Sequence, residues 1–143
     1  MNQQQVDKFV SSLPSVESSE AFGYHNYFYG GELRIPFLRI ANSESMYEER
    51  SNLKRKGVFR VDLSVRGETF RKFFSSNDIN VDALDYTQLN QFMPHPEFWR
   101  QNFLCILNPA GPNKARLEHL IREAYELSKW RYEGRGLDIE LWP

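Results

Sequence analysis

Alternating hydrophobic and polar residues mark the clearest element of the chain, the segment GVFRVDLSV at residues 57–65. Every second residue from Phe59 to Val65 is apolar, and Arg60 and Asp62 are among the residues between them. This period of two predicts a β-strand with one face on the core and the other toward solvent. Arg60 and Asp62 are therefore expected side by side on the outer face, either as a solvated ion pair or as contacts for a polar ligand.

Weaker patterns predict the other elements. Helical spacing of apolar residues predicts helices at residues 2–13, 67–75 and 113–131. Runs of aromatic and β-branched residues predict further strands at residues 21–29, 33–41, 88–93 and 102–107. Gly30 and Gly31 are expected to form the hairpin turn between the first two of these strands. Because regular βαβ alternation is missing, this order predicts an α+β fold: a single domain over residues 1–143, with an antiparallel β-sheet and helices packed mainly on one face.

Composition limits the class of protein. The 143 residues suit one domain, and an aromatic fraction of 15% exceeds what a small core needs, so some rings are expected to line a pocket or a contact surface. A net charge of −1 argues against nucleic acid as the main partner. The single cysteine, Cys105, excludes an internal disulfide, and the sequence shows neither a signal peptide nor a long apolar run. We therefore expect a cytoplasmic protein without membrane contact.

The histidines are the first candidates for chemistry. His25, His95 and His119 lack the spacing of metal ligands, and the sequence has no HExxH, CxxC, GxGxxG or P-loop motif, so neither a metal nor a cofactor is expected. His95 stands between Pro94 and Pro96. The stiff backbone of such a turn suits either contact with a ligand or a hydrogen bond to a backbone group.

The preferred hypothesis is a module that binds a small molecule, rather than an enzyme. It places a cleft between aromatic walls, with imidazole and guanidinium groups as polar contacts. The residues expected to contact the ligand are His25, Tyr27, Tyr29, Arg60, His95 and Trp99, with Tyr24 as a further wall. Two alternatives stay open: an enzyme in which His95 is the general base, and a homodimer formed through exposed aromatic strand edges.

A basic segment supports another alternative. Residues 50–72 hold eight basic and two acidic residues, whereas the rest of the chain is acidic overall. A loop at the start of this segment could contact phosphate groups of nucleic acid, or a protein partner. The residues expected to do so are Arg50, Lys54, Arg55 and Lys56.

Three segments together resemble a known family: GVFRVDLSVRGETFRKFF (57–74), PHPEFWRQNFLCILNP (94–109) and LIREAYELSKWRYEGR (120–135). This combination is similar to that of small bacterial proteins catalogued as a domain of unknown function, and it covers most of the chain from about Tyr24 onward. The resemblance implies the fold but no activity. More loosely, the order of elements is similar to that of the MmcQ/YjbR-like proteins, which implies an N-terminal helix packed with a sheet and a suggested ability to bind DNA.

Overall fold

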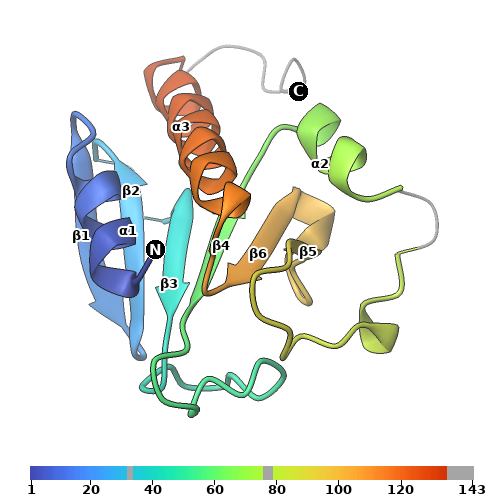
Figure 1. Ribbon diagram of the computed structural model, residues 1–143. Helices are drawn as coiled ribbons and strands as arrows, with labels where there is room; N and C mark the ends of the chain where they lie inside the picture. Colours follow the sequence, from blue (N-terminus) through green and yellow to red (C-terminus); the bar gives the residue numbers. More distant parts are fainter. Residues whose placement is uncertain (32–33, 76–78, 135–143) are drawn as a thin grey trace.

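The computed structural model describes residues 1–31, 34–75 and 79–134 (Figure 1). Within those ranges, the helices, strands and 3₁₀ turns are α1 (Gln3–Ser11), β1 (Val16–Ala21), β2 (Tyr24–Tyr29), β3 (Leu38–Ala41), β4 (Arg60–Ser64), α2 (Gly67–Phe73), η1 (Val81–Ala83), β5 (Met93–Pro94), η2 (Trp99–Gln101), β6 (Phe103–Leu107) and α3 (Pro112–Glu133). The strands form an antiparallel sheet in the order β1-β2-β3-β4-β6-β5. The predicted α+β class is confirmed.

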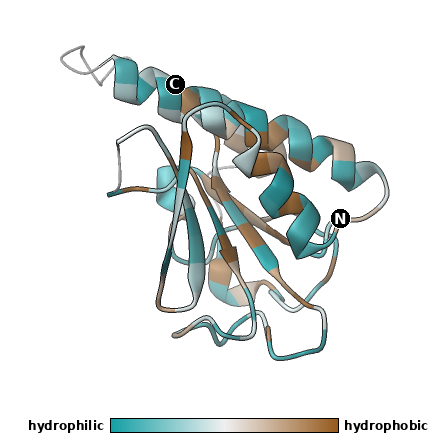
Figure 2. Cartoon of the chain, turned by 90° about the vertical axis from the view of Figure 1, so that its left-hand side faces the viewer, coloured by the Kyte–Doolittle hydropathy of each residue, from teal (hydrophilic) through white to brown (hydrophobic). Residues whose placement is uncertain are grey.

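One face of the sheet carries the main hydrophobic core. Leu38, Leu63 and Leu104 lie opposite one another on β3, β4 and β6, and all three are fully buried. Helices α1 and α3 lie over this face (Figures 1 and 2), and Ile121 of α3 belongs to the same cluster. Burying an aliphatic side chain of this size contributes about 1.5–3 kcal/mol, so apolar packing holds this helix-covered face together.

Local sequence explains where these two helices begin. Asn2 and Gln5 form a capping box, in which each side chain accepts a hydrogen bond of 2.8 Å from the backbone N–H of the other. Helix α3 begins at Pro112, whose fixed φ suits a first helical turn. The longest helix of the described ranges is α3, and neither it nor any other helix there combines the length and the apolar character needed to cross a membrane.

The opposite face of the sheet is covered by irregular chain. Tyr24 and Leu53 belong to a small apolar cluster at one end, and Tyr86 and Cys105 belong to another that lies beside β5. Between the two clusters lie buried polar side chains. We call this the loop-covered face. It is where the structure departs most from the expected solvated surface.

The first predicted strand proves to be parts of two strands. Phe22 and Gly23 both have positive φ, +54° and +80°, and form the two-residue turn between β1 and β2. Strand β1 was missed because its sequence, VESSEA, is exposed along almost its whole length at the sheet edge, so no hydrophobic alternation marks it. The two-residue hairpin therefore precedes β2. Gly30, with φ of +58°, and Gly31 form a turn after β2, as predicted, and β2 pairs antiparallel with β3.

Two other predicted strands are shorter than expected. Strand β3 begins only at Leu38, after Pro36, which has no N–H to donate to a neighbouring strand. Residue 33, where this strand was expected to begin, lies outside the described residues. Strand β5 contains only Met93 and Pro94, although a strand was predicted over 88–93.

Candidate functional site

A salt bridge between Arg60 and Asp62 of β4 forms the centre of the candidate site. Both residues are 0% exposed on the loop-covered face. Arg60 donates from Nε to Asp62 Oδ1 at 2.6 Å and from Nη2 to Oδ2 at 3.0 Å. Such a two-bond pair matches the planar guanidinium to the carboxylate and fixes both orientations. The expectation of a solvated ion pair was therefore wrong, because segments distant in sequence cover this face.

The loop after β3 binds the other end of Arg60. Its Nη1 lies 2.7 Å from Glu48 Oε1 and 3.1 Å from Ser51 Oγ. The side chain of Glu48 is 6% exposed, so this second ion pair is also shielded from water. Arg60 thus faces two carboxylates, and every buried side-chain N or O atom of the described residues has a hydrogen-bond partner. A fully satisfied network of this kind is rigid.

His95 joins the network from the turn after β5. The backbone N–H groups of Glu97 and Phe98 both donate to its Nδ1 at 3.0 Å, so the ring hydrogen sits on Nε2. Nε2 lies 3.4 Å from Asp62 Oδ2. The ring also stacks on Phe98, with 4.8 Å between centroids and 25° between planes. His95 is 0% exposed, and both of its ring nitrogens are engaged within the protein.

The charges of the central pair are fixed by their surroundings. Burial alone would raise the pKa of Asp62, but Arg60 and His95 outweigh that effect and hold the pKa well below its usual range. Burial would likewise lower the pKa of Arg60, whereas the attraction of Asp62 raises it. Asp62 is therefore a carboxylate, and Arg60 a guanidinium, over the whole physiological range.

Arg39 of β3 connects this buried network to the surface. Its Nε donates to Asp62 Oδ2 at 3.1 Å, and its side chain is 20% exposed. The guanidinium lies 4.2 Å from the ring centroid of Tyr24 and 5.5 Å from that of Phe98. Held by one carboxylate and two rings, Arg39 presents a positive group with a defined orientation.

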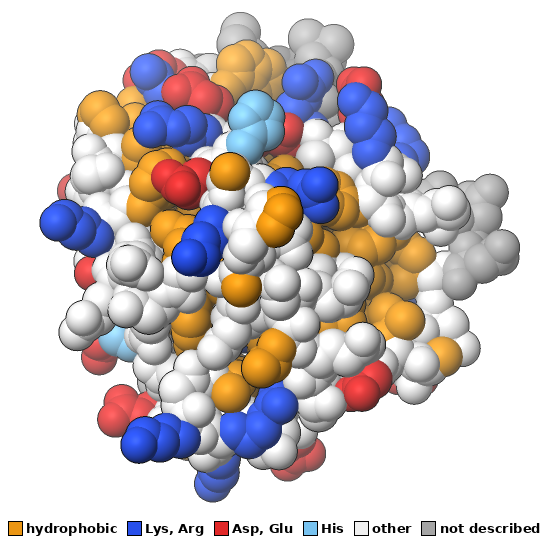
Figure 3. All heavy atoms as spheres, viewed as in Figure 1, with side chains coloured by type: hydrophobic (Ala, Val, Ile, Leu, Met, Phe, Trp, Pro, Cys, Tyr) orange, Lys and Arg blue, Asp and Glu red, His pale blue; other side chains and the backbone are white. Residues whose placement is uncertain are grey.

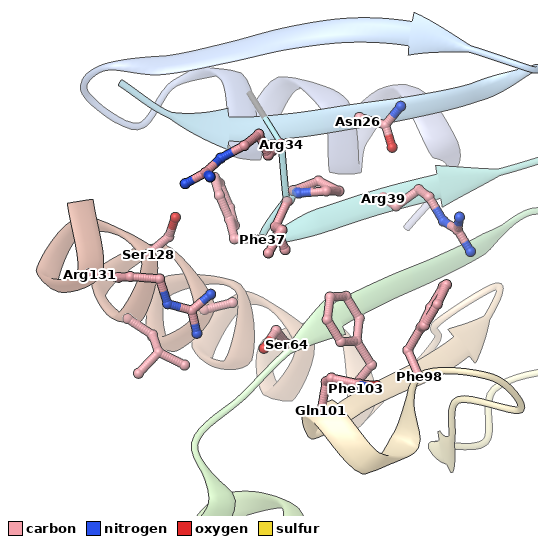
Figure 4. Close-up of a pocket in the computed structure, with 14 residues that line it drawn as sticks. Asn26, Arg34, Phe37, Arg39, Ser64, Phe98, Gln101, Phe103, Ser128 and Arg131 are labelled. Atoms are coloured by element: carbon pink, nitrogen blue, oxygen red, sulfur yellow. The ribbon is translucent and has the colours of Figure 1, made fainter. Parts of the chain in front are cut away.

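A cavity of about 480 Å³, which we call the Arg39 cavity, opens beside this side chain between α3 and the chain around η2. Figure 4 shows Phe37 and Phe103 among the rings that line it, with Arg34 and Arg131 on the side of α3. None of the described residues that line the cavity is acidic. The cavity combines apolar walls with three guanidinium groups.

A second hollow beside α2 differs in kind. Figure 3 shows hydrophobic side chains gathered there, and Phe73, Phe74 and Phe92 line a cavity of about 550 Å³. The charged side chain among its described lining residues is that of Arg116, which is exposed on α3. No salt bridge fixes that arginine in place within the described residues, so the Arg39 cavity is the better candidate for specific binding.

The structure divides the predicted site residues between the two faces of the sheet. Arg60 and His95 meet at Asp62. On the helix-covered face, the hydroxyl of Tyr27 donates to Asp7 at 2.6 Å and that of Tyr29 to Glu133 at 2.7 Å. His25 shares that face and pairs with Glu20 at 3.1 Å, while Trp99 packs against the main core. The six residues therefore do not line one cleft.

A family model described as a family of unknown function, DUF6194, matches residues 1–136. The chain belongs to this family. The resemblance to a domain of unknown function is thus confirmed, whereas the looser similarity to the MmcQ/YjbR-like proteins is not. Neither a curated protein nor a solved structure matches this DUF6194 chain.

The basic segment of this DUF6194 chain mostly stabilises its own fold. Arg50 donates to the carbonyl of Val81 at 2.6 Å and lies over the ring of Tyr86. Arg55 donates to the carbonyls of Ser51 and Thr87, at 3.0 and 2.9 Å. Both arginines thus join the loop after β3 to the segment that precedes β5. Lys54 and Lys56 are exposed.

Sequence reasoning missed Arg39, Glu48 and Ser51. Arg39 did carry a signal, because a charged residue between Leu38 and Ile40 shares a strand face with the residues opposite it on β4. Glu48 and Ser51 carried none, since they lie in an irregular loop whose path depends on tertiary contacts. No three His, Cys, Asp or Glu side chains come together as metal ligands in the part of the chain that the structure describes.

Proposed function

We propose that this DUF6194 chain binds a small molecule that carries a carboxylate or phosphate group on an apolar, ring-sized body, and that the Arg39 cavity is the site. The observation that carries the proposal is Arg39 itself. Its side chain is partly exposed and lines the cavity, yet its guanidinium is held in place by Asp62 and lies over the rings of Tyr24 and Phe98. A binding group that is already oriented loses little conformational entropy when the ligand arrives.

The charge and size of the cavity support the same class of ligand. Arg39 lines it, with no acidic side chain among its described lining residues, and the guanidinium of Arg39 favours anions. Guanidinium groups bind carboxylates and phosphates through paired hydrogen bonds. A volume of about 480 Å³ lies in the usual range for small-molecule sites, and the rings of Phe37 and Phe103 suit an apolar ligand body.

The geometry of His95 supports binding rather than general-base catalysis. A general base needs a lone pair within reach of the substrate. Nδ1 of His95 already accepts two backbone N–H groups, and Nε2 faces Asp62. We therefore assign His95 a positioning role: it supports the carboxylate that holds Arg39. We also propose that the protein is cytoplasmic, which fits a buried and unpaired Cys105.

The test is calorimetric titration of the full chain with phenyl phosphate and benzoate, with benzyl alcohol as the neutral probe. We expect the two anions to bind and the alcohol not to bind. Arg39→Gln should weaken anion binding at least about tenfold, because the oriented cation is lost. Arg122→Gln is the matched control, since Arg122 also lies over a ring, that of Phe9, but is not among the residues that line the cavity.

Two results would overturn this assignment. Equal binding of benzyl alcohol would show that the cavity does not select charge, and unchanged anion binding by Arg39→Gln would place the site elsewhere. A short DNA duplex is the competing probe. Binding of DNA that weakens as salt rises, and that survives Arg39→Gln, would move the function to Lys54 and Lys56 of the basic segment.

A further inference from the structure

A second cavity, of about 400 Å³, lies next to the Arg39 cavity. Asn26 and Arg39 line both. Phe98 lines the first cavity and Tyr24 the second, and the guanidinium of Arg39 lies over the rings of both residues. The two cavities therefore meet at Arg39.

Two exposed aromatic side chains flank the second cavity. Phe22 is 67% exposed and Tyr47 is 81% exposed, although they come from the β1–β2 turn and from the loop after β3. Their ring centroids are 6.4 Å apart, with 59° between the planes. Large apolar side chains left in water close to one another are typical of contact sites.

The backbone at both aromatic residues is strained. Phe22 has φ of +54° and Tyr47 has φ of +64°, which place both in the left-handed region. That region is unfavourable for bulky side chains and is usually occupied by glycine or asparagine. Stability alone therefore favours a different residue at each position. Retained strain of this kind points to a role in binding.

Hydrogen bonds hold the two strained positions together. The backbone N–H of Met46 donates to the carbonyl of Phe22 at 2.9 Å, and Ser45 Oγ donates to that of Gly23 at 2.8 Å. The hydroxyl of Tyr24 donates to the carbonyl of Met46 at 2.8 Å. The contact is so close that a Cβ on Gly23 would lie 2.1 Å from the carbonyl oxygen of Glu44. The loop is thus fixed on the turn, and the rings of Phe22 and Tyr47 come from an ordered frame.

We propose that Phe22 and Tyr47 form a second subsite, which binds a flat ring of the same ligand whose anionic group binds Arg39. The inference rests on the proposed function and extends it. Because the cavities meet at Arg39, the ligand class is an elongated anion with a flat apolar group on each side of its charge. One ring lies among the phenylalanines of the Arg39 cavity, and the other lies against Phe22 and Tyr47.

Two phosphate diesters of equal charge test this subsite. Diphenyl phosphate has a ring on both sides of its anionic group, whereas methyl phenyl phosphate has one. In calorimetric titrations of the full chain we expect diphenyl phosphate to bind about tenfold more tightly, the gain that corresponds to about 1.4 kcal/mol of further ring contact.

The double variant Phe22→Asn, Tyr47→Asn removes both rings and places at each position a residue that tolerates positive φ. We expect the tenfold preference to fall below twofold, with the affinity for methyl phenyl phosphate unchanged. The melting temperature should not fall. Leu89→Asn is the control for loss of an exposed apolar side chain, since Leu89 is 48% exposed and lies outside both cavities.

The outcomes separate the two proposals. Equal affinity of the wild-type chain for both diesters, or a tenfold preference that survives in the double variant, would overturn the second subsite and leave the Arg39 cavity as the binding site. If neither diester binds although phenyl phosphate does, the second subsite fails and the Arg39 cavity stands. If phenyl phosphate does not bind either, the proposed function fails and the second subsite falls with it.

Discussion

On the helix-covered side of β4, Val61 and Leu63 pack among apolar residues of both helices and the neighbouring strands. On the loop-covered side of the same strand, Arg60 and Asp62 bind each other and groups from three other segments. Both sides are equally dry, since all four side chains are 0% exposed. Apolar packing tolerates small changes of shape, whereas a buried charge without its partner is very costly. The site is therefore built on the face that is less tolerant of change.

The largest expected effect comes from breaking the network at its centre. Asp62→Asn keeps the shape of the side chain but leaves Arg60 with one carboxylate partner in place of two. We expect a loss of about 3–5 kcal/mol in the free energy of unfolding, measured by urea denaturation. A loss below about 1 kcal/mol would mean that Glu48 alone neutralises Arg60. In that case the proposed difference between the faces would not hold.

A substitution that creates a cavity on the helix-covered face, Leu63→Ala, gives the value for comparison. It should lower the free energy of unfolding by about 2–5 kcal/mol, depending on how far the surrounding core relaxes. Unlike the Asp62 variant, it removes no charge, so its effect on stability should be the same at pH 3 and pH 7, below and above the ordinary pKa of an aspartate. Urea midpoints at the two pH values measure this. A pH-dependent penalty would show that the two faces are coupled electrostatically through the sheet.

Acid should weaken the loop-covered face selectively. The pKa of Asp62 is lowered in the folded state from an ordinary value of 3.8, so the stability it contributes is complete above about pH 5 and is lost as pH falls toward the folded pKa. Between the unfolded and the folded pKa, this carboxylate takes up its proton only in the unfolded chain. The free energy of unfolding therefore falls by about 1.4 kcal/mol for each pH unit. Asp62→Asn should remove this part of the slope of stability against pH.

Asp82→Asn is the control for the acid experiment, because the side chain of Asp82 is 89% exposed in its contact with Arg50. Its slope of stability against pH should equal that of the wild-type chain. If both variants have the wild-type slope, the carboxylate of Asp62 does not govern acid sensitivity.

The smallest expected effect has the opposite sign. Phe22→Asn replaces a strained aromatic residue in the β1–β2 turn with one that favours positive φ, and it creates the Asn-Gly pair typical of such turns. We expect stability to rise by about 1 kcal/mol. Thermal unfolding measures the change. A fall in stability would show that the Phe22 ring contributes packing to the fold rather than being kept for contact with a ligand.

How much of the fold and of the candidate site could be predicted depends on how far apart in the sequence the interacting residues stand. The alternation in residues 57–65 correctly placed Phe59, Val61 and Leu63 on one face, because the period of a strand is a local property. The same alternation could not show that Arg60 and Asp62 are buried, since polar residues alternate identically whether water or a loop covers them. Besides Arg60, the partners of Asp62 stand at positions 39 and 95, far away along the chain.

The candidate site shows the same limit. The rigid turn around His95 was predicted from its two prolines, and its contact with the backbone of Glu97 is local. Its meeting with β4 depends on the pairing of β5 and β6, which no spacing reveals. Tyr27 and Tyr29 share one face of β2 because they are two residues apart, but the sequence did not show that Asp7 and Glu133 would bind their hydroxyl groups.

The two edges of the sheet also affect how copies of this chain meet in a crowded solution. Strand β1 forms one edge, and two copies paired there about a two-fold axis would bring the glutamates of VESSEA close to one another. Strand β5 forms the other edge, where two residues, one of them Pro94, offer little backbone for a further strand. Both ends of the sheet thus resist strand addition, the first step of amyloid-like aggregation, and a dimer of this chain would have to form through a different surface.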